Sequence, residues 1–250
     1  MRTDPLGRRA FAELVGTGLL VAAVVGSGIA AARLSPGDIG LELLENTVAT
    51  VGALIALILA LGPVSGAHLN PVVTLADRFF GGISTVDTTA YIAAQTAGAV
   101  CGSVLANAMF ALPAFESSTR ARSTGPLWLA EVVATFGLVL VIFAVVRSGQ
   151  ASAAPLAVGA YIGGAYFFTS STSFANPAVT IGRMFSDTFA GIKPSSAPMF
   201  IAAQIGGGAL AVAAIKILYP HIAASAADVV VPYRAESTDG STAPSEEVRP

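Results

Sequence analysis

Apolar residues in this chain gather in six long stretches that are separated by shorter polar segments. A helix needs about 20 apolar residues to cross a hydrocarbon core about 30 Å thick. Each stretch is long enough, so we predict an all-α membrane protein with six transmembrane helices. The predicted spans are 11–32, 42–62, 88–111, 127–147, 151–171 and 197–219.

Two further apolar stretches are too short to span a membrane, and each contains an Asn-Pro pair. Asparagine is a favoured N-cap residue, and proline fits the first helical position because its missing N–H group would have no partner there. We therefore predict two re-entrant half-helices, at 68–80 and 176–187.

The two halves of the chain carry the same motifs in the same order. Residues 11–17 resemble 129–135, residues 70–74 resemble 176–180, and residues 91–95 resemble 200–204. Each copy has three spans, an odd number, so the second copy inserts upside down. Paired short segments interrupted by proline in such inverted repeats indicate a site near the membrane midplane. The predicted organisation is a cytoplasmic N-terminal segment (1–10), a first repeat (11–111), a connecting loop (112–126), a second repeat (127–219) and a disordered tail (220–250).

Composition supports the membrane assignment and excludes several function classes. The chain is 54% hydrophobic and 11% charged, whereas soluble domains carry about 25% charged residues. A net charge of -2 with no basic block gives no reason to expect nucleic acid. The single cysteine, Cys101, excludes an internal disulfide, and its apolar neighbours predict a buried, inert thiol. One cysteine and two histidines offer no convincing nucleophile and base, so we expect neither an enzyme nor a cofactor or metal.

The arginines favour one orientation in a bacterial cell membrane. Arg2, Arg8 and Arg9 precede the first span, and Arg147 lies between the fourth and fifth. An even number of spans puts both termini on one side, and the positive-inside rule makes that side the cytoplasm.

The two Asn-Pro breaks predict a pore. Irregular backbone at membrane depth is tolerated only inside protein or beside a water-filled cavity. Half-helices that enter from opposite faces would bring their amino ends together, and each end carries roughly half a positive charge. Asn70 and Asn176 would add amide donors. Such a centre suits neutral molecules with oxygen lone pairs and repels cations.

SGAHLNPVVT, FANPAVT and the AE-x-x-x-T starts of the first and fourth spans resemble the signatures of the major intrinsic proteins, the aquaporin and aquaglyceroporin family. The resemblance covers about residues 8–219. It implies six tilted helices, two half-helices, a pore in each subunit and a homotetramer. It also implies that Glu13 and Glu131 hydrogen-bond the backbone of the half-helix loops. The pore motifs it assigns are Asn70, Pro71, Val72, Asn176, Pro177 and Ala178.

The resemblance also assigns a selectivity filter, built from one residue of the second span, one of the fifth and two of the second half-helix loop. Val179 stands where the family normally has an arginine, and small residues replace the bulky side chains of water-selective members. We therefore expect a wide, uncharged ring. Counting from the two asparagines, the ring consists of Thr50, Gly164, Ser173 and Val179.

Two polar residues near the motifs leave alternatives open. Arg183 lies one helical turn beyond Val179, where it is either a substitute filter arginine in the outer vestibule or a partner of Asp187 in a salt bridge, and we favour the salt bridge. His68 precedes Asn70 by two residues, and we expect it to pack or to line the pore approach rather than to bind a metal.

The predicted function is a passive channel for water and small uncharged hydroxylated solutes, such as glycerol-like polyols. Val179 and the stretch SDTFAGI (186–192) resemble a bacterial branch of the family often encoded beside arsenic-resistance genes. That resemblance adds arsenite, in its neutral form As(OH)₃, to the candidate solutes. The alternatives are a water-selective aquaporin, a non-conducting scaffold, or a coupled secondary transporter, for which the sequence shows no coupling-ion site.

Overall fold

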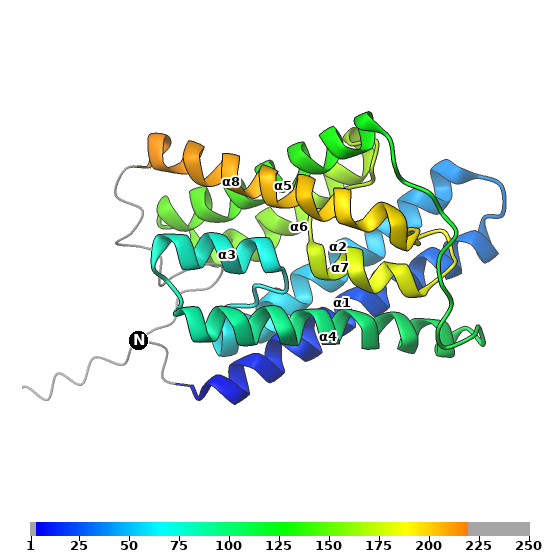
Figure 1. The fold of residues 1–250 in the computed structure, drawn as a ribbon, viewed down its shortest axis with the longest axis horizontal. Helices are drawn as coiled ribbons and strands as arrows, with labels where there is room; N and C mark the ends of the chain where they lie inside the picture. Colours follow the sequence, from blue (N-terminus) through cyan, green and yellow to red (C-terminus); the bar gives the residue numbers. More distant parts are fainter. Residues whose placement is uncertain (1–3, 220–250) are drawn as a thin grey trace, which may run out of the picture.

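The structure is a computed structural model that describes residues 4–219 (Figure 1). Arg2 and the tail predicted to be disordered, 220–250, lie outside the described residues. Within those residues the chain forms helices and no strand. The main helices are α1 (Leu6–Leu34), α2 (Ile39–Ser65), α3 (Pro71–Phe80), α4 (Thr85–Met109), α5 (Gly125–Arg147), α6 (Ala154–Phe168), α7 (Pro177–Gly182) and α8 (Ala197–Leu218). Three short 3₁₀ helices are η1 (Ala151–Ala153), η2 (Arg183–Phe185) and η3 (Pro194–Ser196).

Six helical segments are long and apolar enough to cross a membrane, which confirms the predicted all-α fold with six spans. These segments are α1, α2, α4, α5, α6 together with η1, and α8 together with η3. The chain is therefore a multi-pass membrane protein. The two remaining helices, α3 and α7, begin at the two Asn-Pro pairs and are the predicted half-helices.

The repeat is visible in the helix packing, because α1 packs most extensively on α4 and its counterpart α5 packs on α8. Glycines make both contacts close. A Cβ atom at Gly98 would overlap the carbonyl oxygen of Leu14, and one at Gly207 would overlap that of Val132. Small residues at such interfaces allow membrane helices to approach closely.

Figure 1 shows how the half-helices fill the space that the spans leave. α3 lies towards the end of the molecule where α1 begins and α8 finishes, and α7 lies towards the opposite end. Their amino ends point to the middle of the bundle, which is the arrangement that the inverted repeat predicts.

The prediction that Cys101 is buried is wrong. Cys101 is exposed on α4, in a stripe that also contains Ala97 and Leu105. The neighbouring Gly98 and Gly102 face α1 instead. A membrane helix can present apolar residues on its outer face as well as to the core, so apolar neighbours in the sequence do not indicate burial.

Candidate functional site

Each half-helix is capped by its own asparagine. The Asn70 Oδ1 atom accepts a hydrogen bond from the backbone N–H of Val72 at 2.9 Å. Asn176 Oδ1 accepts one from Ala178 at 3.0 Å. The prolines that follow, Pro71 and Pro177, occupy the first turn of α3 and α7 and are buried. The local chemistry of the Asn-Pro pair therefore forms two helix starts of the same kind.

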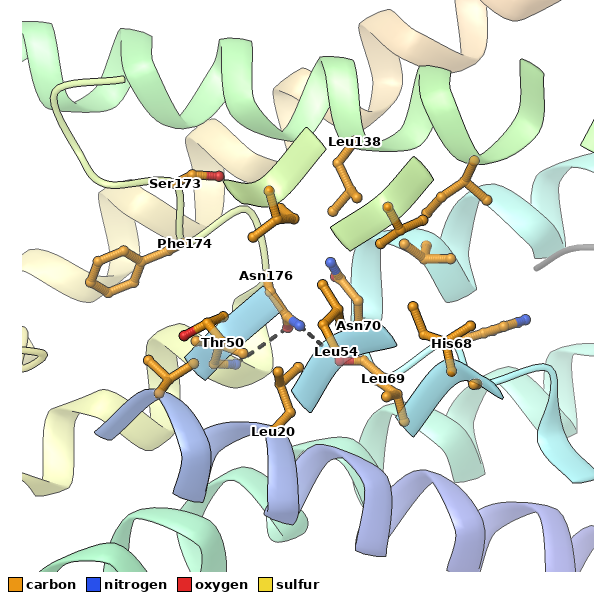
Figure 2. Close-up of a pocket in the computed structure, with 18 of the residues that line it drawn as sticks. Leu20, Thr50, Leu54, His68, Leu69, Asn70, Leu138, Ser173, Phe174 and Asn176 are labelled. Carbon is orange, nitrogen blue, oxygen red and sulfur yellow. Dashed lines mark hydrogen bonds between the residues drawn. The ribbon is translucent and has the colours of Figure 1, made fainter. Parts of the chain in front are cut away.

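The two asparagines also cross-link the two halves of the molecule. Asn70 Nδ2 donates to the carbonyl oxygen of Ala175 at 2.8 Å, and Asn176 Nδ2 donates to that of Leu69 at 2.7 Å. An amide NH₂ group has two donors, and these bonds use one of them on each side chain. Both asparagines line a cavity, where the second donor is available to a solute (Figure 2).

The loops that lead into the half-helices hold the same unusual backbone conformation. Non-glycine residues rarely adopt positive φ, because the left-handed region costs roughly 1–2 kcal/mol per residue. In each of these two loops, three residues have positive φ, and they occupy equivalent positions in the repeat. The residues are Gly66, Ala67 and Leu69 in the first loop and Thr172, Ser173 and Ala175 in the second.

Two fully buried glutamates bind this strained backbone. The carboxylate of Glu13 accepts hydrogen bonds from the N–H groups of His68 at 3.0 Å and Leu69 at 2.7 Å. That of Glu131 accepts from Phe174 and Ala175, both at 2.9 Å. Each carboxylate therefore satisfies two consecutive backbone donors that the bent loop directs inward.

A glutamine completes each of these clusters. Gln95 Nε2 donates to Glu13 at 2.8 Å and to the hydroxyl of Thr74 at 3.0 Å. Gln204 Nε2 donates to Glu131 at 2.6 Å and to the hydroxyl of Thr180 at 2.9 Å. The glutamines thereby connect α4 and α8 to the two half-helices.

The cavity is lined unevenly, with apolar side chains over most of its wall and polar groups in a few places. Figure 2 shows His68 and Phe174 towards opposite ends, with Asn70 and Asn176 between them. We call these ends the His68 end and the Arg183 end. The apolar wall includes Leu20, Val24, Leu54, Ile58, Val73, Leu138, Ile142, Val158 and Ile162.

Three of the four predicted filter residues line the cavity: Thr50, Ser173 and Val179. All three are buried, and the Ser173 hydroxyl has no hydrogen-bond partner among the described residues. The structure therefore brings together one residue of α2 and two residues of the second loop and α7.

The prediction for Gly164 is wrong. Gly164 is exposed, with little but Phe168 near the position of its missing Cβ atom, and it is not among the residues that line the cavity. α6 instead faces the cavity with Val158, Ile162 and Tyr166, which are four residues apart. Counting back from Asn176 relies on the family's spacing between the fifth span and the second loop, but here α6 ends at Phe168 and turns Tyr166, rather than Gly164, towards the cavity.

Tyr166 is the α6 residue that sequence reasoning missed. It is 3% exposed, and its hydroxyl donates to the Thr50 Oγ1 atom at 3.2 Å. The four-residue spacing along α6 carries the signal for Tyr166, once Ile162 is known to face inward. The filter region therefore contains the hydroxyls of Thr50, Tyr166 and Ser173 beside the apolar Val179.

The salt bridge favoured for Arg183 is not formed, and the alternative position near the filter describes it better. Asp187 accepts hydrogen bonds from Thr119 instead. Arg183 is 2% exposed and lines the cavity. Its Nε donates to the carbonyl oxygen of Ala190, and its guanidinium carbon lies 3.4 Å from the centroid of the Phe174 ring. The helical segment ends at Phe185, so Asp187 is not one helical turn beyond Arg183 and instead contacts the connecting loop.

A second arginine lies behind Phe174. The guanidinium carbon of Arg122 is 5.0 Å from the ring centroid, and its nitrogens donate to Gly191 and Ser171. Burial, with a smaller contribution from Arg120, lowers the pKa of Arg122 to about 10. It therefore stays protonated at neutral pH, and the Arg183 end carries more than one positive charge.

His68 lines the other end of the cavity. Its Nδ1 atom is 3.1 Å from the Thr74 hydroxyl, and its Nε2 atom is 3.3 Å from a carboxylate oxygen of Asp77. The His68 ring also contacts Tyr91 edge to face. Within residues 4–219, no three His, Cys, Asp or Glu side chains lie together as metal ligands, at His68 or elsewhere.

Comparisons with known proteins agree with this geometry. The model of the family described as Major intrinsic protein matches residues 1–173. The chain is 48% identical over 218 residues to aquaglyceroporin AqpS of Rhizobium meliloti (strain 1021), covering 87% of this chain and 93% of that protein. It is 34% identical over 195 residues to the glycerol uptake facilitator protein of Streptococcus pneumoniae (strain ATCC BAA-255 / R6), covering 69% and 80%. The solved structure of the aquaglyceroporin from Plasmodium falciparum shares the fold, with a TM-score of 0.63 at 21% identity over 87% of this chain and 99% of that one.

Proposed function

The chain belongs to the major intrinsic protein family and is a passive membrane channel rather than an enzyme, and on that premise we propose that it conducts water and small uncharged hydroxylated solutes. Glycerol-like polyols are the first candidates, and arsenite in its neutral form As(OH)₃ is a further one because it also presents several hydroxyls on a compact centre. The relatives named above as an aquaglyceroporin and a glycerol uptake facilitator support the polyol class.

The observation that carries this proposal is the mixed wall of the cavity, which is mostly apolar with polar groups in a few places. Apolar side chains form most of this wall, and its polar groups are the two asparagines, the hydroxyls of Thr50, Tyr166 and Ser173, and His68 and Arg183 at the two ends. A polyol has the same division between a carbon backbone and a row of hydroxyls. Ligand sites of this kind use apolar contact for most of the surface and a few polar groups for orientation.

Val179 supports passage of solutes larger than water. An arginine at this position would add five fixed donors and a permanent charge to the ring. A valine adds neither, and its side chain is shorter. Tyr166 restores part of the bulk that Gly164 was expected to remove, so the filter in this proposal is narrower than the sequence suggested but still lacks a charge at position 179.

The remaining predicted roles belong to the same proposal. Glu13 and Glu131 hold the half-helix loops in the conformation that presents the asparagines, and His68 lines the approach to them. The proposal includes a homotetramer in a bacterial cell membrane, with a pore in each subunit and both termini in the cytoplasm.

A water-selective aquaporin is the second candidate, and Arg183 is the observation that favours it. A guanidinium in the cavity wall near Val179 narrows the Arg183 end and supplies donors that water satisfies easily. Under this alternative the ring passes water and rejects glycerol despite Val179.

Stopped-flow light scattering on proteoliposomes with wild type and Val179→Arg separates the two candidates. Under the proposal, wild-type vesicles shrink and then re-swell in glycerol and in arsenite, and Val179→Arg slows both solutes about tenfold or more while water flow changes little. Val179→Leu is the matched control, because it enlarges the side chain without adding charge, and it should slow solutes less. Wild-type vesicles that pass water and neither solute would support the water-selective alternative.

A further inference from the structure

Repeat-equivalent residues form the same contact in the two halves of the pore, with different chemistry. His68 and Phe174 each stand two residues before the asparagine, and Asp77 and Arg183 each stand seven residues after it. His68 contacts Asp77 at 3.3 Å, and Phe174 contacts Arg183 at 3.4 Å from its ring centroid. The fold therefore brings one ring and one charged group together at each end, but the charge is negative at the His68 end and positive at the Arg183 end.

We propose that Arg183 is the residue that excludes cations from this pore, and that it replaces the filter arginine that is missing at position 179. The inference rests on the proposed channel and names a specificity-determining residue for it. Sodium and potassium ions would meet a fixed positive charge at the Arg183 end, whereas uncharged hydroxylated solutes would meet a hydrogen-bond donor.

The contacts of Arg183 hold its guanidinium at the cavity wall. Nε donates to the carbonyl oxygen of Ala190, and the planar group stacks on Phe174. None of the hydrogen bonds found within residues 4–219 uses its two terminal nitrogens, and no carboxylate in that range forms an ion pair with it. The Glu131 carboxylate attracts Arg183 from beyond ion-pair distance, but it already accepts hydrogen bonds from the backbone of Phe174 and Ala175. A buried cation that forms no ion pair keeps most of its electrostatic effect, because little solvent screens it.

The other arginines near this end are not placed to do the same. Arg122 does not line the cavity, and its bonds to Gly191 and Ser171 fix the loop. Arg120 is exposed and lies over Phe189. Both add to the positive field at this end, but only Arg183 forms part of the wall past which a permeating ion must move.

The buried carboxylate at the His68 end does not cancel this barrier. Asp77 is fully buried and is not one of the residues that line the cavity, whereas its partner His68 is. An ion in the pore would therefore contact the histidine ring rather than the carboxylate. The lone fixed charge among the described cavity-lining side chains, apart from the titratable His68, is Arg183.

The test compares sodium influx and glycerol re-swelling in proteoliposomes of the full chain. The variants are Arg183→Gln, which keeps a planar donor but loses the charge, Arg183→Lys, which keeps the charge, and Arg120→Gln, which removes an exposed charge from the same end. Sodium influx is read with a trapped sodium-sensitive dye, and glycerol re-swelling reports whether the pore is assembled.

We expect wild type, Arg183→Lys and Arg120→Gln to admit sodium no faster than protein-free vesicles. Arg183→Gln should admit it at least about tenfold faster, because a unit charge in a poorly solvated wall is lost, and it should still re-swell in glycerol. An Arg183→Gln channel that passes glycerol and remains tight to sodium overturns the proposal, and so does an Arg120→Gln channel that leaks as much.

Phe174→Leu keeps the proposal testable if Arg183→Gln does not assemble. This variant keeps the arginine but removes the ring that holds it, so we expect a sodium leak between those of wild type and Arg183→Gln. A sodium-tight Phe174→Leu channel with normal solute flow would count against Arg183. If wild type passes water but no glycerol, the proposed solute class fails, and sodium influx with water permeability as the assembly readout still decides the role of Arg183.

Discussion

The two half-helices of this channel and the loops before them have the same backbone arrangement, but their buried charges are of opposite sign. α3 and α7 are each capped by an asparagine whose amide group also donates to a backbone carbonyl of the other half. Each follows a loop with positive φ values that is bound by a buried glutamate. The contact between each loop and its half-helix is also repeated, but it is His68–Asp77 in one half and Phe174–Arg183 in the other.

This difference separates the residues that build the pore from those that select what passes. The shared residues satisfy backbone donors that any version of this fold would leave unpaired, so both copies of the repeat keep them. The ring–charge contacts, His68–Asp77 and Phe174–Arg183, satisfy no such requirement and can differ between the halves. We therefore expect equivalent substitutions of the shared residues to have similar effects in both halves, and substitutions of Asp77 and Arg183 to have different effects.

The largest effect should follow removal of either glutamate. Glu13→Ala and Glu131→Ala each remove the acceptor of two buried backbone N–H groups and one glutamine N–H, and Glu13→Ala also removes the acceptor of the Ser65 hydroxyl. Each unsatisfied group costs about 1–3 kcal/mol. Both variants should lower the melting temperature of the detergent-purified protein strongly and by similar amounts. Glu13→Gln and Glu131→Gln, which keep one acceptor oxygen, should lose less. A near-normal melting temperature for one alanine variant and a strongly lowered one for the other would contradict the claim that the two glutamates have equivalent roles.

A smaller loss of stability, again equal in the two halves, should follow when alanine replaces glycine at the close helix contacts. Gly98→Ala and Gly207→Ala place a methyl group against the carbonyl oxygens of Leu14 and Val132, and overpacking of this kind costs about 1–3 kcal/mol. Gly206→Ala is the control, because a Cβ atom there would meet nothing within 4 Å. The melting temperatures should fall together for Gly98→Ala and Gly207→Ala and stay near wild type for Gly206→Ala. A stable Gly207→Ala would contradict the packing described for α5 and α8.

Asp77→Asn removes the negative charge at the His68 end, which is the counterpart of the Arg183 charge. Because Asp77 lies behind His68 and outside the cavity wall, sodium exclusion should stay as in wild type, and glycerol re-swelling should change less than about twofold. Sodium influx into vesicles carrying this variant is the measurement. A leak as large as that expected for Arg183→Gln would contradict the account, because losing a negative charge cannot itself admit more cations and the leak would have to come from the packing around His68.

The smallest effect is expected at Cys101, which belongs to neither half-helix. Cys101→Ser should change the unfolding free energy by less than about 0.5 kcal/mol, as surface substitutions usually do. The wild-type thiol should react with a maleimide in detergent, because Cys101 is exposed. In a Cys101→Ser background, Ser103→Cys should stay unlabelled, since Ser103 is fully buried against the backbone of α7. An unreactive Cys101 would contradict its exposed position on α4.

The fold and the centre of the pore follow from local chemistry that the sequence displays. The six apolar stretches correspond to the six spans because the bilayer fixes how long a span must be. Asn70 and Asn176 cap their half-helices through contacts two residues away, which adjacent letters of the sequence already specify.

The filter was harder to predict because its residues meet through tertiary contacts. Gly164 is placed in the filter by counting back from Asn176 at the family's spacing, whereas α6 presents Tyr166 to the cavity. The partner of Arg183 is the ring of Phe174 rather than the carboxylate of Asp187, which accepts hydrogen bonds from Thr119 of the connecting loop. The repeat itself held a usable signal, since the contact between His68 and Asp77 has its counterpart in Phe174 and Arg183.

The most direct test of the central claim is the response of wild-type proteoliposomes to an inward glycerol gradient, followed by stopped-flow light scattering beside the same vesicles in sucrose. The account predicts shrinkage followed by re-swelling in glycerol, faster than in protein-free vesicles, and shrinkage alone in sucrose. Shrinkage without re-swelling in both sugars and polyols, at a normal water permeability, would contradict the claim that the cavity between His68 and Arg183 passes small uncharged hydroxylated solutes.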